Sequence, residues 1–178
     1  MGVPMDYFYR KAQEVVRKYG TRDPYELLDA IGANLRFSDN YSADGLKGFA
    51  AIKKNCMFAV VNAKLDEHER RIVVGHECSH LINHRQEILA SSAKALQDFM
   101  LYRNNSRLEY EANQFLADFL TSDENVLDVI ASGNDGYFTL AQELHLPPEL
   151  LAFKLYSMMQ RDLPVRTPVE LRSDFLKQ

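Results

Sequence analysis

The sequence predicts an α+β fold in which a small three-stranded antiparallel sheet is packed with about six or seven helices. Two strand-length apolar runs, 46–52 and 56–61, flank the polar segment 53–55, which is the pattern of an antiparallel hairpin. After residue 66, apolar residues recur at helical spacing between capping and turn residues. The chain has 178 residues, of which 46% are hydrophobic, enough to bury the core of one ordinary domain.

The segment before the hairpin predicts two helices and one strand. The first helix is expected over 6–19, because Gly20 follows it and suits the left-handed conformation that ends many helices. Asp23 and Pro24 are typical of an N-cap and a first helical residue, so a second, short helix should follow. The remaining strand of the sheet is expected over 34–37.

The segment after the hairpin is expected to be helical almost throughout. Asp66 and Glu69 form a capping-box pattern, which predicts a helix from residue 66 to about residue 83. Further helices are expected over 90–102, 106–120, 122–133, 139–145 and 148–159. The chain shows no internal repeat and no long linker, so the sequence predicts a single domain, 1–178, in which 123–178 form a helical C-terminal lobe.

Charge and hydropathy exclude several classes of protein. The formal net charge is -4, whereas proteins that bind nucleic acid through phosphate contacts are normally basic, so we expect no direct binding of nucleic acid. No apolar stretch approaches the roughly 18 residues of a membrane span, and the N-terminus lacks the pattern of a secretion signal. Two cysteines cannot form a disulfide framework. We therefore expect a cytoplasmic protein without membrane contacts.

One motif carries recognisable chemistry. His76, Glu77 and His80 form a His-Glu-x-x-His pattern on the helix expected over 66–83. Residues four apart lie on the same face of a helix, so the two imidazoles can bind one ion. Zn²⁺ accepts imidazole nitrogen, and the intervening glutamate can take a proton from water. The alternative is a helix whose histidines are ordinary surface or core groups.

A third ligand would have to come from elsewhere in the chain. His84 continues the spacing of four, but a straight helix places it about 12 Å along the axis from His76, too far to share an ion. We therefore expect His84 to be a surface residue.

The helix expected over 106–120 offers three acidic candidates for that ligand. Glu109 lies about 65° from the centre of the apolar stripe and Glu111 about 95° on its other side, and Asp118 follows later. Asn113, one turn beyond Glu109, could hydrogen-bond a neighbouring ligand. However, Ser106 and Glu109 also form a capping box, which would explain this glutamate without a metal. Spacing alone leaves the choice open.

Two segments resemble the ImmA/IrrE family of metallopeptidases. They are IVVGHECSHL at 72–81 and EYEANQFLADFL at 109–120. Members of that family carry an apolar approach to His-Glu-x-x-His and then a helix of the type Glu-x-x-Ala-Asn-x-Phe. The hairpin segments GFAAI at 48–52 and FAVVN at 58–62 are also similar, so the resemblance covers roughly residues 20–122. Cys78, Leu116 and Thr121 depart from the usual pattern, and these departures concern packing rather than ligands.

The resemblance implies a zinc-dependent peptidase of the gluzincin type. Carried over by position, it implies His76, His80 and Glu109 as zinc ligands and Glu77 as the general base. It also implies a protein substrate inside the cell, typically a helix-turn-helix repressor of a phage or mobile element, and hence a role in transcription regulation. The sequence itself predicts neither the substrate nor the oligomeric state.

A competing interpretation is a non-enzymatic module that binds DNA or protein and has a structural or vestigial metal site. Residues 137–159 have the sequence pattern of a helix-turn-helix motif. Its second helix offers only Lys154 before Arg161, which is few cations for contact with phosphates. Packing of its leucines against the rest of the chain is the favoured explanation.

Overall fold

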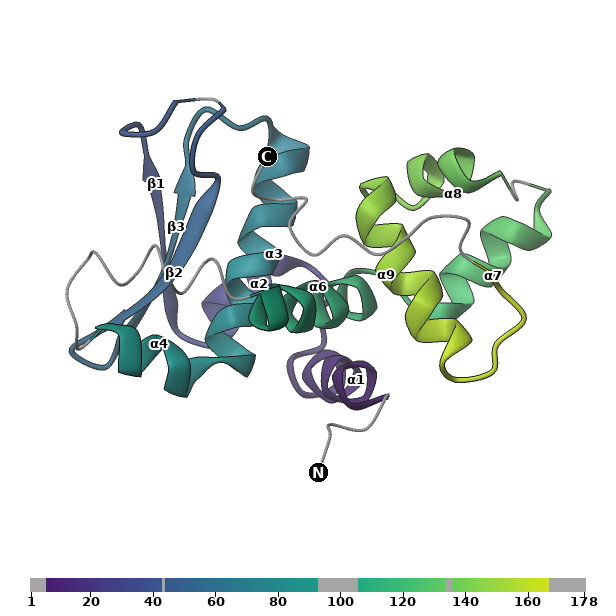
Figure 1. Ribbon diagram of the computed structural model, residues 1–178, viewed down its shortest axis with the longest axis horizontal. Helices are drawn as coiled ribbons and strands as arrows, with labels where there is room; N and C mark the ends of the chain where they lie inside the picture. Colours follow the sequence, from purple (N-terminus) through teal and green to yellow (C-terminus); the bar gives the residue numbers. More distant parts are fainter. Residues whose placement is uncertain (1–5, 43, 93–105, 134–135, 167–178) are drawn as a thin grey trace. The chain divides into compact units, whose positions relative to one another are not determined.

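The α+β fold class is confirmed by the computed structural model, which describes residues 6–42, 44–92, 106–133 and 136–166 (Figure 1). Within these residues it has eight helices and three strands. The helices are α1 (Tyr7–Tyr19), α2 (Pro24–Ala30), α3 (Glu67–Asn83), α4 (Arg85–Ser92), α6 (Ser106–Leu120), α7 (Asp123–Ala131), α8 (Tyr137–Glu143) and α9 (Pro148–Met159). The strands are β1 (Ala33–Ser38), β2 (Gly48–Lys53) and β3 (Cys56–Asn62). The helix expected over 90–102 lies largely outside the described residues.

The chain divides into two compact units. One contains the described residues of Asp23–Ala112, with the sheet, α2, α3, α4 and the first half of α6. The other contains the described residues of Met1–Arg22 and Asn113–Arg172 and is helical. We call them the sheet unit and the helical unit. The expectation of a single domain with a helical lobe from residue 123 stays a prediction.

The sheet is mixed rather than antiparallel, which corrects the prediction for β1. Its strand order is β1-β3-β2, with β3 in the centre (Figure 1). β2 pairs with β3 antiparallel, as the hairpin pattern predicts, whereas β1 pairs with β3 parallel. The hairpin reverses the chain once between β2 and β3, and β1 occupies the opposite edge of β3 in the same direction as β3. No local pattern in the sequence specifies that pairing.

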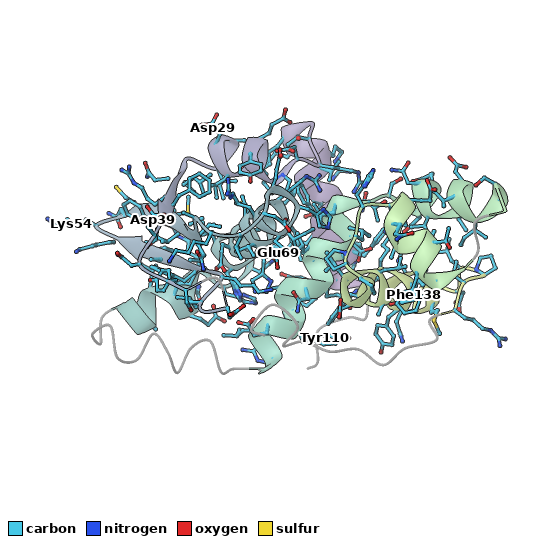
Figure 2. All side chains as sticks on the ribbon, turned by 90° about the horizontal axis from the view of Figure 1, so that it is seen from above. Asp29, Asp39, Lys54, Glu69, Tyr110 and Phe138 are labelled. Atoms are coloured by element: carbon cyan, nitrogen blue, oxygen red, sulfur yellow. The ribbon has the colours of Figure 1, made fainter. Side chains whose placement is uncertain are left out.

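The hairpin between β2 and β3 is closed by a two-residue turn, one residue shorter than the polar segment 53–55. Lys53 pairs with Cys56, and both Lys54 and Asn55 have positive φ, at 50° and 64°. Positive φ at both central positions is the requirement of a type I′ turn, whose twist matches that of the strands. Figure 2 shows Lys54 at the outer end of the hairpin. This turn fixes the register in which Gly48 pairs with Val61.

The helical unit is built around α9, of which eight of twelve residues are buried. Its apolar core consists of Val126, Leu140, Ala141, Leu151, Leu155, Met158 and Val165. Lys154 of α9 is also buried, and its ammonium group forms ion pairs with Asp118 and Asp123. A recognition helix must expose its cations to phosphates, so the burial of α9 argues against the helix-turn-helix interpretation.

The described helices contain no segment with both the length and the apolar content that crossing a lipid bilayer requires.

Candidate metal centre

Helix α3 is the central element of the sheet unit and carries the His-Glu-x-x-His motif. The Asp66 side chain accepts a hydrogen bond of 2.8 Å from the Glu69 N–H, which confirms the predicted helix start. All ten residues of the run 72–81 are buried, the polar residues of the motif among them. A helix buried on every side is covered by other elements all round, and here α2, β2 and β3 all pack against α3. The motif therefore lies in the interior of the unit.

His76, His80 and Glu109 converge on one point. These three residues are only 2–3% exposed. The Nε2 atoms of the two histidines are 3.1 Å apart. Glu109 Oε2 lies 3.3 Å from His76 Nε2, and Glu109 Oε1 lies 3.5 Å from His80 Nε2. Among the described residues, these three form the group of potential ligands whose atoms are close enough to share one metal ion.

Helix α6 brings Glu109 to this point through the packing of its apolar face. Leu108 and Ala112, on either side of Glu109, are buried. The Ser79 hydroxyl of α3 donates a 2.9 Å hydrogen bond to the Ala112 carbonyl, which ties α6 to α3 one turn beyond Glu109. The structure thus places Glu109, rather than Glu111 or Asp118, beside the two histidines.

The electrostatics of the group favour metal-binding protonation states. Burial lowers the pKa of His80 to about 4, although the nearby Glu109 carboxylate opposes the shift. Burial alone would raise the pKa of Glu109, but its contacts with His76 and His80 hold it well below its usual range. At neutral pH His80 is therefore a neutral imidazole and Glu109 a carboxylate, which are the forms that bind divalent metals.

The backbone of β2 lies directly beside Glu77, a contact that the sequence analysis missed. A Cβ atom placed on Gly48 would lie 3.1 Å from Glu77 Oε1 and 2.5 Å from Val73 Cγ1. Only glycine therefore fits at this position without a shift of its neighbours. A glycine inside an apolar strand often marks such a close approach of the backbone, and Gly48 at the start of the predicted hairpin was that signal.

A comparison with family models identifies the family. Residues 37–156 match the family model described as "Peptidase_M78: IrrE N-terminal-like domain". The chain belongs to the Peptidase_M78 family. The resemblance to ImmA/IrrE metallopeptidases is thereby confirmed, and the peptidases of the M78 family are metal-dependent. The matched segment includes all four residues predicted for the site.

The chain is also similar to a phage protein. It is 30% identical over 111 residues to "Uncharacterized immunity region protein 2" of Bacillus phage phi105. The matched segment covers 62% of this chain and 66% of that relative, so the chain spans just under two thirds of the relative's length. No solved structure matches the chain.

His84 of this M78 chain is buried, so the expectation of a surface residue is wrong. It is 1% exposed, and its Nδ1 lies 2.9 Å from Nδ1 of His80. Helix length separates His84 from His76, but His84 reaches the group through its contact with His80. The spacing of four between His80 and His84 was the signal for that contact.

The two other acidic candidates of α6 have different partners. Glu111 Oε2 lies 3.0 Å from His84 Nε2, and Glu111 Oε1 accepts a hydrogen bond from Arg107. Asp118 belongs to the helical unit, where it pairs with Lys154. The hydrogen bond predicted from Asn113 to a ligand stays a prediction.

Proposed function

We propose that this chain is a zinc-dependent metallopeptidase of the gluzincin type. His76, His80 and Glu109 are its zinc ligands, and Glu77 is its general base. The observation that carries the proposal is the convergence of the two imidazoles and one carboxylate: the two Nε2 atoms are 3.1 Å apart, and the nearer Glu109 oxygen lies 3.3 Å from one of them and the other oxygen 3.5 Å from the second. Tetrahedral zinc with bonds of about 2.0–2.1 Å holds its ligand atoms about 3.3 Å apart, so the distances among these side chains fit this ion.

The chemistry follows from the groups at the site. Zinc, when bound, lowers the pKa of a water molecule towards about 7 and polarises the carbonyl of the scissile bond. Glu77 takes the proton of the attacking water and later delivers it to the leaving amine. Glu77 follows His76 on a buried helix, and the bare backbone of Gly48 leaves its carboxylate uncrowded.

Strand β2 supports a binding mode for the substrate. Among the described strands it lies at an edge of the sheet, and its Gly48 lies against Glu77. An extended peptide that pairs with an edge strand gains main-chain hydrogen bonds independent of its sequence. A substrate bound along β2 in this way would lie close to Glu77, the proposed general base.

The substrate we propose is a repressor-type regulator of a phage or mobile element, cleaved in the cytoplasm to release transcription. The similarity to a phage immunity region protein supports this choice. The net charge of -4 and the buried α9 support a protein substrate over direct contact with DNA.

The test compares wild-type protein with Glu77→Gln in cleavage of the repressor encoded beside this gene. We expect both proteins to bind one zinc ion per chain, measured by metal analysis, and only the wild type to cleave. Cleavage by a zinc-loaded Glu77→Gln protein would exclude the proposed base. An intact repressor after incubation with zinc-loaded wild-type protein would exclude the proposed substrate. Zinc binding without cleavage of any repressor or peptide would favour the non-enzymatic alternative.

A further inference from the structure

A chain of polar side chains leads from the proposed metal ligands to the surface of the sheet unit. His80 Nδ1 lies 2.9 Å from His84 Nδ1, and His84 Nε2 lies 3.0 Å from Glu111 Oε2. Glu111 Oε1 accepts a 2.7 Å hydrogen bond from Arg107. The four side chains come from α3, its C-terminal cap and the first half of α6. His84 and Glu111 thus each use one polar atom for the preceding residue and the other for the following residue.

The hydrogen-bond pattern is satisfied by one tautomer of each histidine. Glu111 is a carboxylate and accepts hydrogen bonds, so Nε2 of His84 carries the proton and donates it. Nδ1 of a neutral His84 then accepts a hydrogen bond from the N–H at Nδ1 of His80. This leaves Nε2 of His80 without a proton, and Nε2 is the atom that faces His76 and Glu109. These hydrogen bonds thus select the tautomer of His80 that can bind an ion through Nε2.

The burial of these side chains decreases from His84 through Glu111 to Arg107. The His84 side chain is 2% exposed, that of Glu111 13% and that of Arg107 62%. A buried imidazole must have partners for both nitrogens, because an unsatisfied polar group in the interior costs stability. An apolar residue would fill the same space without that requirement, so packing alone does not account for a histidine here.

We propose that His84 and Glu111 are positioning residues of the metal centre: they hold the His80 ring in the orientation and tautomer that bind the ion. The inference rests on the proposed function, because it takes His80 as a ligand. Outer contacts of this kind fix ligand geometry, and their loss typically lowers metal affinity by about 10–100-fold.

The test measures the dissociation constant of Zn²⁺ by chelator competition at one fixed pH, using the full chain. We expect His84→Ala to weaken zinc binding by about 10–100-fold. We expect Glu111→Gln to weaken it less, because the amide oxygen still accepts a hydrogen bond but carries no charge. The matched control is His68→Ala, since His68 is an exposed histidine on the same helix. This control should bind zinc as the wild type does.

Two further measurements separate positioning from a merely structural role. The absorption spectrum of the Co²⁺-loaded protein reports ligand geometry, and we expect it to change in His84→Ala and not in His68→Ala. His84→Asn places an oxygen near the position of Nδ1, so it should restore part of the zinc affinity that His84→Ala loses. Glu111→Gln, which alters a partly exposed side chain, keeps the proposal testable if His84→Ala does not fold.

The outcomes distinguish this inference from the proposed function. Wild-type zinc affinity and an unchanged Co²⁺ spectrum in folded His84→Ala or Glu111→Gln would overturn the positioning role and leave the zinc ligands in place. Failure of the wild-type chain to bind zinc would instead overturn the proposed function. Equal loss of affinity in His84→Ala and His68→Ala would mean a general effect on α3 and would also overturn the positioning role.

Discussion

The two units each bury an acidic side chain, and they surround it with different partners. In the helical unit the carboxylate of Asp118 is completely buried, and its partners are the Lys154 ammonium at 2.9 Å and the Ser157 hydroxyl at 2.6 Å. In the sheet unit Glu109 is 3% exposed, and its partners are the imidazoles of His76 and His80. Both carboxylates belong to helix α6.

This difference shows which of the two groups could hold a metal ion. Lys154 contacts both Asp118 and Asp123, and Arg161 also pairs with Asp123, so the chain itself provides the positive charge of the helical unit. Imidazoles provide lone pairs instead, and two of them together with a carboxylate form a ligand set that catalytic zinc accepts. A cluster of carboxylates is therefore a weak predictor of a metal site, whereas a carboxylate that converges with two imidazoles is a strong one.

The largest expected effect is on metal binding in the sheet unit. Glu109→Gln keeps the shape of the side chain and removes its charge, so zinc affinity should fall by more than about 100-fold, beyond the cost of changing an outer contact. Cleavage should fall with it. Chelator competition measures the affinity, and His68→Ala again provides the control. Wild-type affinity in Glu109→Gln would remove this residue from the ligand set.

The next effect concerns the stability of the helical unit. Lys154→Met leaves Asp118 and Asp123 without their shared ammonium, and breaking a buried pair in this way costs about 3–5 kcal/mol. Urea unfolding measures the change, and exposed Lys53→Met should leave stability within about 0.5 kcal/mol of the wild type. Zinc affinity should not change. A loss below about 1 kcal/mol in Lys154→Met would show that the buried ammonium contributes little.

A smaller effect is expected where β2 meets Glu77. Gly48→Ala adds a methyl group that overlaps Val73 and crowds the carboxylate of Glu77. We expect kcat/KM to fall about tenfold, equivalent to about 1.4 kcal/mol, with zinc affinity unchanged. Combining it with Val73→Ala makes room for the methyl group and should recover part of the loss. Full activity in Gly48→Ala would mean that the strand moves away easily.

The smallest effect is a dependence of stability on pH. Burial would raise the pKa of Asp123, but hydrogen bonds from Arg161 and Lys154 lower it to about 2. The native pKa lies below the ordinary value of 3.8, so ionised Asp123 stabilises the fold above about pH 4. That stabilisation disappears as the pH falls towards 2. Asp123→Asn should therefore cost about 1 kcal/mol near pH 7.

The measurement is urea unfolding of wild type and Asp123→Asn at several pH values. The difference between their unfolding free energies should shrink steadily below pH 4. A difference that stays constant down to pH 2.5 would contradict the assignment of the shifted pKa to Asp123.

The parts of the site that could be predicted from sequence depend on local geometry. His76 and His80 share a helix face because they are four residues apart, and this holds wherever the helix packs. Glu109 was different, because a capping box explained it equally well. Spacing within α6 could not decide whether Glu109 is a metal ligand or a capping residue. The family resemblance favoured a ligand, and the fold then placed Glu109 beside the histidines.

The features that sequence reasoning missed are contacts between distant segments. The parallel pairing of β1, the approach of Gly48 to Glu77 and the contact of His84 with Glu111 each join residues at least 23 positions apart. Periodicity describes one element at a time, so it cannot assign such neighbours. His84 also shows that a residue too far away to bind the ion can still contact a residue that is placed to bind it.

The two-residue turn at Lys54 and Asn55 gives this protein a particular sensitivity to insertions. Side chains alternate between the faces of a strand, so slipping β2 by one residue against β3 would exchange its two faces. Lys47 or Phe49 would then point towards Glu77 in place of a hydrogen atom. Substitutions at this tip by residues that adopt positive φ readily, such as glycine or asparagine, should be harmless. A single added or deleted residue that shifts the register should abolish the proposed activity.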